Sequence, residues 1–280
     1  MSARALVAGA GYLGGALAER LVRAGSEVVA LRRSEAPAPA GVRAFRADLA
    51  EPGALAALPE ADLVFYAAAA DERSDAAYER AYVTGVARLV ERLARQRTPP
   101  RRLVYVSSTA VYAQQDGAWV DETSPTEPSG FTGRRLLEGE ARAHAAPFPV
   151  AVLRLGGLYG PGRASLVERV ASGTARATRG FTNRIHRDDA AGALLHLAEL
   201  PNAARCYLGV DSEPAREAEV LAWLAARLGV PAPPAEEGEP GARARGDKRC
   251  SNARLLATGF RFRYPTYREG YAALLGARDA

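Results

Sequence analysis

A glycine-rich segment near the start of the chain, Gly9-Ala10-Gly11-Tyr12-Leu13-Gly14, limits the folds open to this sequence. A short apolar run precedes it, and apolar residues at helical spacing follow it as far as Gly25. In a strand–loop–helix of this kind, the first glycine permits a tight turn and the second lets a ligand approach the backbone. The third allows close packing of helix on strand, and the helix N-terminus holds an anion. The segment predicts a pyrophosphate-binding turn, and a turn without a ligand is the alternative.

The pattern that follows alternates between strand and helix. Strands are expected over residues 4–8, 26–31, 42–46, 63–67, 103–106 and 150–155, and helices over 52–58, 78–96 and 135–146. Such alternation predicts an α/β fold with a doubly wound parallel Rossmann sheet. We expect one domain over residues 1–280, with a small C-terminal substrate-binding lobe built mainly from segments after about residue 156. The segment 231–246 is dense in Pro, Gly, Glu and Arg and is expected to be an exposed loop.

The end of the second expected strand selects among dinucleotides. The strand ends Ala30-Leu31-Arg32-Arg33, with no carboxylate before Glu35. An acidic residue there would bind the ribose hydroxyls of NAD, whereas arginine suits the 2′-phosphate of NADP. We therefore expect NADP in preference to NAD, through Arg32 and Arg33. Two solvated arginines in an arginine-rich chain are the alternative.

Composition excludes several classes of function. The chain has one lysine, Lys248, among 37 basic residues, so a Walker-type phosphate loop and an early catalytic lysine are absent. The net charge is +5, but the sequence contains no run of five or six basic residues, so we expect no nucleic-acid partner. Two cysteines and three scattered histidines predict neither a disulfide framework nor a metal site. No apolar stretch reaches about 18 residues, so we expect a cytoplasmic protein without a membrane partner.

Residues 102–112, Arg-Leu-Val-Tyr-Val-Ser-Ser-Thr-Ala-Val-Tyr, resemble the strand-plus-serine segment of the extended short-chain dehydrogenase/reductases, which include NAD(P)-dependent epimerases and dehydratases. Residues 154–163 and 184–189 are similar to later segments of that superfamily. The resemblance implies a small carbonyl or hydroxyl compound, or a nucleotide-sugar, as substrate, and a homodimer is common in the family. It implies that Ser108 orients the reacting oxygen. The implied cofactor-binding residues are Gly9, Gly11, Tyr12, Leu13, Gly14, Asp48, Leu49, Ala67, Ala68, Ala69 and Ser107.

The chain departs from this family at the Tyr-x-x-x-Lys pair. The segment 129–138 reads Ser-Gly-Phe-Thr-Gly-Arg-Arg-Leu-Leu-Glu. Aligning Arg135 with the lysine places Phe131 at the tyrosine, and aligning Arg134 places Gly130 there. Neither residue can transfer a proton, and arginine stays protonated. The sequence is therefore most similar to the atypical branch of the superfamily, with Arg135 as a weak substitute for the lysine and Thr132 as a nearby hydroxyl.

Two functions stay open from the sequence. The first is an NADP-dependent enzyme of the epimerase/dehydratase or reductase type, in which an unidentified group or water delivers the proton. The second is a non-catalytic NADP-binding redox sensor or interaction protein, which the missing tyrosine favours. Lys248 and Arg249 are expected to bind a phosphate-bearing substrate, or else to form a plain surface pair. Trp119 is expected to cover the substrate pocket or to anchor its loop.

Overall fold

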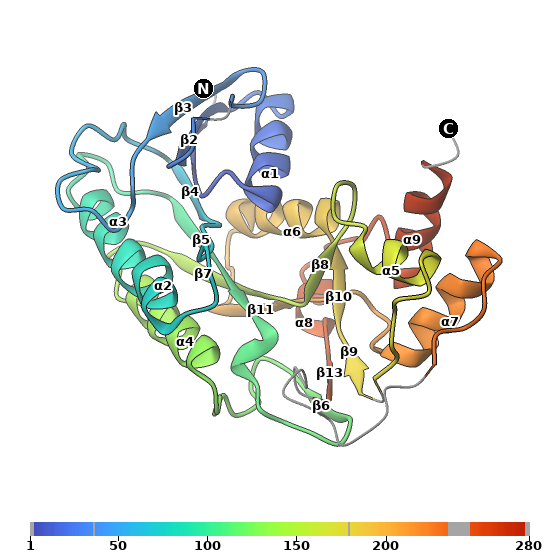
Figure 1. The fold of residues 1–280 in the computed structure, drawn as a ribbon. Helices are drawn as coiled ribbons and strands as arrows, with labels where there is room; N and C mark the ends of the chain where they lie inside the picture. The colour runs from blue at the N-terminus through green and yellow to red at the C-terminus, as the bar shows by residue number, and fades with distance from the viewer. Residues whose placement is uncertain (1–2, 36, 179, 235–246, 278–280) are drawn as a thin grey trace. The chain divides into compact units, whose positions relative to one another are not determined.

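A seven-stranded sheet forms the centre of the fold in the computed structural model, which describes residues 3–35, 37–178, 180–234 and 247–277 (Figure 1). The strand order is β11-β7-β5-β4-β1-β2-β3. The strands are β1 (Arg4–Ala8), β2 (Glu27–Arg32), β3 (Val42–Arg46), β4 (Leu63–Tyr66), β5 (Arg102–Ser108), β7 (Val150–Leu155) and β11 (Cys206–Gly209). The pairs β1–β2, β2–β3, β1–β4 and β4–β5 are parallel, and the predicted Rossmann sheet is confirmed.

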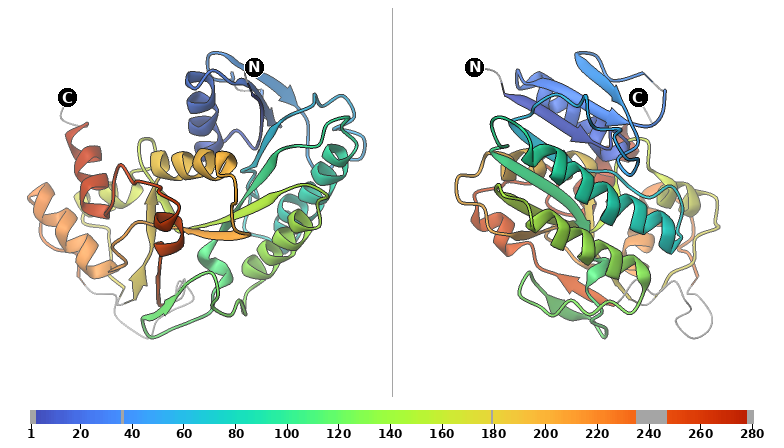
Figure 2. Two further views of the ribbon diagram at one scale, coloured as in Figure 1. Left: turned by 180° about the vertical axis from the view of Figure 1, so that it is seen from behind. Right: turned by 90° about the vertical axis from the view of Figure 1, so that its left-hand side faces the viewer.

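Helices cover both faces of this sheet. Helix α1 (Tyr12–Arg23) lies on one face, while α3 (Gly85–Ala94) and α4 (Phe131–His144) run side by side over the other (Figure 2). Helix α2 (Asp75–Tyr78) and the π-helical turn η1 (Glu79–Thr84) lead into α3. Helix α6 (Arg187–Glu199) precedes β11.

Three expected helices differ from the structure. The helix expected over residues 52–58 is wrong, because the chain forms a series of turns there, with Gly53 at a φ of +75°. The helix expected over 78–96 begins earlier, because the hydroxyl of Ser74 accepts a hydrogen bond from the N–H of Ala77 and caps α2. Helix α4 begins at Phe131, after an extended Gly130, so its first turn contains Thr132.

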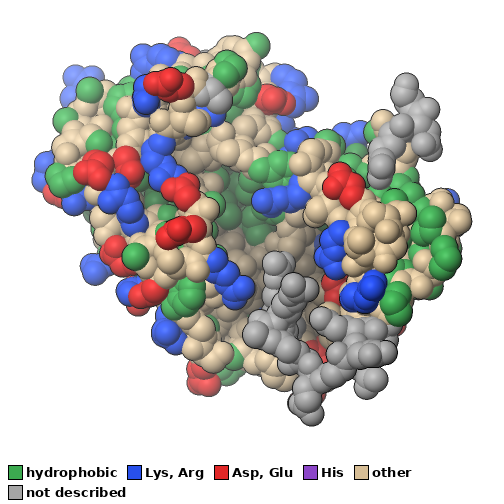
Figure 3. Space-filling model, viewed as in Figure 1, with side chains coloured by type: hydrophobic (Ala, Val, Ile, Leu, Met, Phe, Trp, Pro, Cys, Tyr) green, Lys and Arg blue, Asp and Glu red, His purple; other side chains and the backbone are tan. Residues whose placement is uncertain are grey.

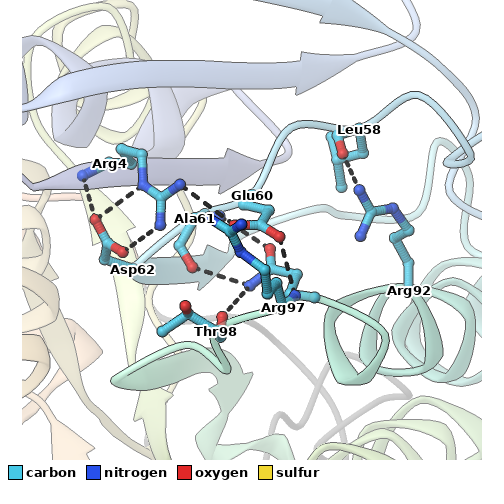
Figure 4. Close-up of polar contacts among 9 residues, drawn as sticks. Arg4, Leu58, Glu60, Ala61, Asp62, Arg92, Arg97 and Thr98 are labelled. Carbon is cyan, nitrogen blue, oxygen red and sulfur yellow. Dashed lines mark hydrogen bonds and ion pairs between the residues drawn. The ribbon is translucent and has the colours of Figure 1, made fainter.

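Side chains fix the edge of the sheet where β1 and β4 begin (Figure 4). The guanidinium of Arg4 donates to Asp62 at 2.7 Å, and its backbone N–H donates to the same carboxylate at 2.9 Å. Gln96 accepts from the N–H of Ala61 at 2.9 Å and donates to its carbonyl at 3.2 Å. These bonds tie the start of β1 and the loop after α3 to the chain that enters β4.

The chain divides into two compact units. The first comprises residues 1–111, 127–154 and 190–207, and the second comprises residues 112–126, 155–189 and 208–280. Each has its own apolar core, around Val64 and Leu89 in the first unit and around Val167 and Leu224 in the second.

The described residues of the second unit form pairs of short strands and several helices. Strand β8 (Gly157–Tyr159) pairs with β10 (Arg184–His186), β9 (Phe181–Thr182) with β12 (Ala215–Arg216), and β6 (Ala118–Val120) with β13 (Lys248–Cys250). The helices are α5 (Ser165–Ala171), α7 (Glu217–Leu228), α8 (Ala253–Ala257) and α9 (Tyr267–Gly276). Most of the loop expected over residues 231–246 lies outside the described residues.

Candidate functional site

The glycine loop between β1 and α1 needs two of its glycines for steric reasons. Gly9 has a φ of +96°, and a Cβ there would lie 2.3 Å from the backbone of Ala68. A Cβ on Gly14 would lie 2.1 Å from the carbonyl oxygen of Gly9. By contrast, a Cβ on Gly11 would meet no atom within 4 Å. The loop is therefore tight against its own chain at Gly9 and Gly14 and open at Gly11.

This open position fits a dinucleotide pyrophosphate. Gly11 is the N-cap of α1, no side chain caps the helix, and its first turn carries no acidic residue. The first N–H groups of a helix lack intrahelical partners, and the helix dipole attracts an anion to them. Tyr12 and Leu13 form the first turn beside this position. A bound nicotinamide dinucleotide would supply the hydride acceptor or donor.

The two arginines at the end of β2 have different partners. Arg32 donates to the hydroxyl of Ser34 at 2.8 and 3.1 Å and to the carbonyl of Pro37 at 3.0 Å. Arg33 forms an exposed ion pair with Asp71, which lies 38 positions further along the chain. The hydrogen bond from Arg33 lowers the pKa of the Asp71 carboxyl. Of these two arginines, Arg33 has a carboxylate partner and Arg32 has none among the described residues.

A third arginine, which the sequence analysis did not select, lies at the same end of the site. Arg80 on η1 forms ion pairs with Asp48, at 2.9 Å, and with Glu51. Burial opposes ionisation of Asp48, but hydrogen bonds from the N–H of Ala50 and from Arg80 leave its pKa lowered. Arg80 also lines a surface hollow with Asp71. Acidic and basic side chains are interspersed over this part of the surface (Figure 3).

The end of β4 brings the alanine segment to the glycine loop. The N–H of Ala67 donates to the carbonyl of Ala8 at 2.8 Å, and Ala68 underlies Gly9. Ala69 follows as an exposed residue. Leu49 is buried next to Gly85. The structure therefore brings Ala67 and Ala68 to the loop.

The two serines at the end of β5 have separate environments. The Ser107 hydroxyl donates to Glu140 at 2.6 Å, and Glu140 forms an ion pair with Arg154 at 2.7 Å. Glu140 and Arg154 are only 6% and 7% exposed. Ser108 is partly exposed, and its hydroxyl accepts from the N–H of Ala110 at 3.2 Å. Ser107 thus belongs to a buried network that the sequence analysis missed, while Ser108 lies at its edge.

The start of α4 packs against the chain that follows Ser108. A Cβ on Gly133 would lie 2.7 Å from the carbonyl oxygen of Ala110, so the first turn of α4, with Thr132, approaches this segment closely. Arg135 instead forms ion pairs with Asp75 and Glu138, each at 2.8 Å. Its whole guanidinium is engaged with these two carboxylates.

A tyrosine on a neighbouring helix lies against Phe131. The ring centroids of Tyr78 and Phe131 are 5.5 Å apart in an edge-to-face arrangement, and Tyr82 lies 5.1 Å from Tyr78. Tyr78 is partly exposed. The sequence did not predict the contact between Tyr78 and Phe131, because the two residues are 53 positions apart.

In the second unit, the neighbouring residues Lys248 and Arg249 have different environments. Lys248 is 2% exposed and donates to the carbonyl of Tyr112 at 2.9 Å, and burial lowers the pKa of its ammonium. Arg249 is partly exposed, and its Nε donates to the carbonyl of Gly117 at 2.6 Å. Lys248 thus supports the fold of the second unit, and Arg249 reaches its surface.

No group of three or more His, Cys, Asp and Glu residues among those described could hold a metal ion. No helix within the described ranges is both long enough and apolar enough to cross a membrane.

Comparison with known proteins identifies the family. Residues 5–205 match the model of the NAD dependent epimerase/dehydratase family. The chain belongs to this family. The resemblance expected from the serine strand and the glycine loop is thereby confirmed.

Three similar proteins are consistent with this family. The chain is 32% identical over 248 residues to a 2-alkyl-3-oxoalkanoate reductase of Stenotrophomonas maltophilia, covering 80% of this chain and 74% of that enzyme. A UDP-glucose 4-epimerase of Streptomyces lividans is 31% identical over 164 residues, and that match spans only 49% of the epimerase. A candidate NAD-dependent epimerase/dehydratase from Methylobacillus flagellatus is similar in structure over the whole of both chains, with a TM-score of 0.85 and 36% identity.

Proposed function

We propose that this protein is an NADP-dependent oxidoreductase of the epimerase/dehydratase type, acting on a small carbonyl or hydroxyl compound or a nucleotide-sugar. The observation that carries the proposal is the open backbone at Gly11 between two sterically required glycines. Because β1, β4 and β5 are parallel neighbours, their carboxyl ends lie at one edge of the sheet, where Gly9 follows β1 and Ser108 is the last residue of β5. Ligands of such sheets bind at that edge. The family membership and the reductase relative support the same class of reaction.

Arg32 supports the preference for NADP. Its guanidinium is held by Ser34 and Pro37 in a fixed position, and no carboxylate among the described residues neutralises it. A guanidinium recognises a phosphate through paired N–H groups. Arg33 would have to exchange Asp71 for the phosphate, so we assign it the lesser part.

The chain's own residues give Ser108 the positioning role. Its partly exposed hydroxyl is the group at the end of β5 that can donate to a substrate oxygen. Proton transfer at that oxygen needs an acid or base within hydrogen-bond reach. Thr132 and Tyr78, on the contacting helices α4 and α2, carry the hydroxyl groups that we propose to test for this role.

A non-catalytic sensor is the second candidate. It is favoured by the engagement of Arg135 with Asp75 and Glu138, which leaves its guanidinium in a surface ion-pair group. In that case the protein would bind NADP and respond to its redox state without turning over a substrate.

Turnover distinguishes the two candidates. Purified protein should oxidise NADPH with at least one member of a panel of 3-oxo acids and simple ketones. Alternatively, it should reduce NADP+ with, or convert, at least one member of a panel of simple alcohols and nucleotide-sugars. Ser108→Ala should lower kcat at least about 100-fold, the lower range for loss of a positioned catalytic hydrogen bond. Tyr78→Phe and Thr132→Val, compared with Tyr82→Phe, then test the proton donor. Tight NADPH binding without NADPH oxidation, NADP+ reduction or conversion of any substrate would favour the sensor.

A further inference from the structure

A second surface hollow of the first unit lies between helix α3 and the turns over residues 51–58, and we call it the α3 hollow. Its volume is about 240 Å³. Pockets for drug-sized ligands are roughly 300–1,000 Å³, so the α3 hollow suits a compact ligand. The charged side chains that line it are Arg88, Arg92, Arg95, Glu51 and Glu91.

Both glutamates of the α3 hollow are already engaged in ion pairs. Glu51 pairs with Arg80, which lies on η1 and does not line the hollow. Glu91 pairs with Arg95, one helical turn further along the chain. These pairs leave no lining carboxylate to neutralise the two remaining arginines of the hollow.

Arg88 has no polar partner among the described residues. No carboxylate, carbonyl or hydroxyl oxygen in that part of the chain accepts a hydrogen bond from its guanidinium, although its Nε is buried. A buried N–H group without an acceptor is rare in native proteins, and a bound ion or water is one explanation for it. Arg88 is therefore the residue of the α3 hollow that is most in need of an external acceptor.

Arg92 lies one helical turn after Arg88, so both side chains are on the same side of α3. Its Nε donates to the carbonyl of Leu55 at 3.1 Å, and a terminal amino group donates to the carbonyl of Leu58 (Figure 4). Carbonyl oxygens fix the orientation of the guanidinium without neutralising its charge. The α3 hollow thus holds two positive charges, and one of them is preorganised.

We propose that the α3 hollow binds a phosphate group between Arg88 and Arg92. Two guanidinium groups one turn apart balance the two negative charges of a phosphate, and their planar N–H groups match its oxygens. Free phosphate and a small phosphate monoester share this chemistry. The α3 hollow is lined by other residues than the glycine loop, so phosphate binding there does not rest on the proposed function.

Calorimetry with NADPH present, at constant ionic strength, measures binding at the α3 hollow. The cofactor is included because the glycine loop also attracts anions. Inorganic phosphate and glycerol 3-phosphate are the probes, and at least one should saturate a single site per chain. Tighter binding of glycerol 3-phosphate would identify a phosphate monoester as the ligand, and tighter binding of inorganic phosphate would identify the free ion.

Three variants locate the site. Arg88→Gln should weaken binding of the saturating probe at least about tenfold, in keeping with loss of a charge-assisted hydrogen bond. Its fold should be intact, because Arg88 has no polar partner to lose among the described residues. Arg23→Gln removes the same charge from an exposed pair with Glu19 on α1 and should leave binding unchanged. Glu91→Gln releases Arg95 into the α3 hollow and should tighten binding about two- to fivefold.

The proposal is overturned if neither probe saturates. It is also overturned if Arg88→Gln and Arg23→Gln weaken binding equally, because the probe would then respond only to the net charge of +5. Failure of the proposed function has a different signature, in which NADPH binding or turnover is lost while Arg88→Gln still weakens phosphate binding. If the α3 hollow fails, NADPH binds to the parent protein and to Arg88→Gln alike and no phosphate is bound.

Discussion

The buried pair Glu140–Arg154 gives the sharpest test of the packing beside Ser108. Arg154 donates to both carboxylate oxygens of Glu140, at 2.9 and 2.7 Å, and the Ser107 hydroxyl donates to one of them. Because both side chains are at most 9% exposed, replacing Arg154 by leucine leaves a carboxylate without a countercharge inside the protein. Loss of one partner of such a pair costs about 3–5 kcal/mol. We expect the free energy of unfolding to fall by this amount in Arg154→Leu and in Glu140→Leu.

The double variant is the matched control. With both charges removed, the buried site is apolar, and such replacements are often neutral. In urea unfolding, the free energy of unfolding of the double leucine variant should therefore fall by far less than the sum of the losses in the two single variants. The reasoning is refuted if each single variant loses less than about 1 kcal/mol, the level of an exposed pair, or if the two losses add.

Three further predictions follow from contacts in each unit. The melting temperature of Gly11→Ala should lie within about 3 °C of that of the parent protein, although this variant should lose affinity for NADPH. Gly9→Ala should be strongly destabilised. Equal melting temperatures of the two variants would contradict the loop geometry. Asp71→Asn releases Arg33 from an exposed pair and should raise NADPH affinity about two- to fivefold in a binding titration, and unchanged affinity would exclude this competition. Burial raises the pKa of Asp211 to about 7, above its unfolded value of 3.8, so its contribution to stability is present below pH 3.8 and is lost as the pH rises to about 7. Melting temperatures measured over this pH range should fall as the pH rises. The fall should be smaller in Asp211→Asn, and an equal dependence on pH in both proteins would contradict the assignment.

Local patterns were sufficient to predict the first unit's main elements. Strands such as β1 and β4 are continuous apolar runs, which is the signature of strands buried on both faces. The glycine loop was predictable because its three glycines occur together at a fixed spacing between a strand and a helix, although only Gly9 and Gly14 are sterically required. The expected helix over residues 52–58 failed because Pro52 and Gly53 favour turns more strongly than a few apolar residues favour a helix.

The contacts of the charged residues could not be predicted in this way. Glu140 lies on α4 between exposed charges, and only the tertiary structure shows that it faces Arg154. Arg33 is distant in sequence from Asp71, and Trp119 lies 130 positions before Arg249, whose guanidinium carbon is 5.0 Å from the Trp119 ring, so no local pattern pairs them. Ion pairs and stacked rings depend on which elements the fold brings together, and a local sequence pattern does not contain that information.

The binding of NADPH and NADH to the parent protein and to Arg32→Ala tests the central claim most directly. Calorimetry should give tighter binding of NADPH than of NADH to the parent protein. Arg32→Ala should weaken NADPH at least about tenfold, in keeping with loss of a charge-assisted hydrogen bond to phosphate, and should change NADH little. Equal affinities in the parent protein, or equal losses in the variant, would contradict the assignment of this site to NADP.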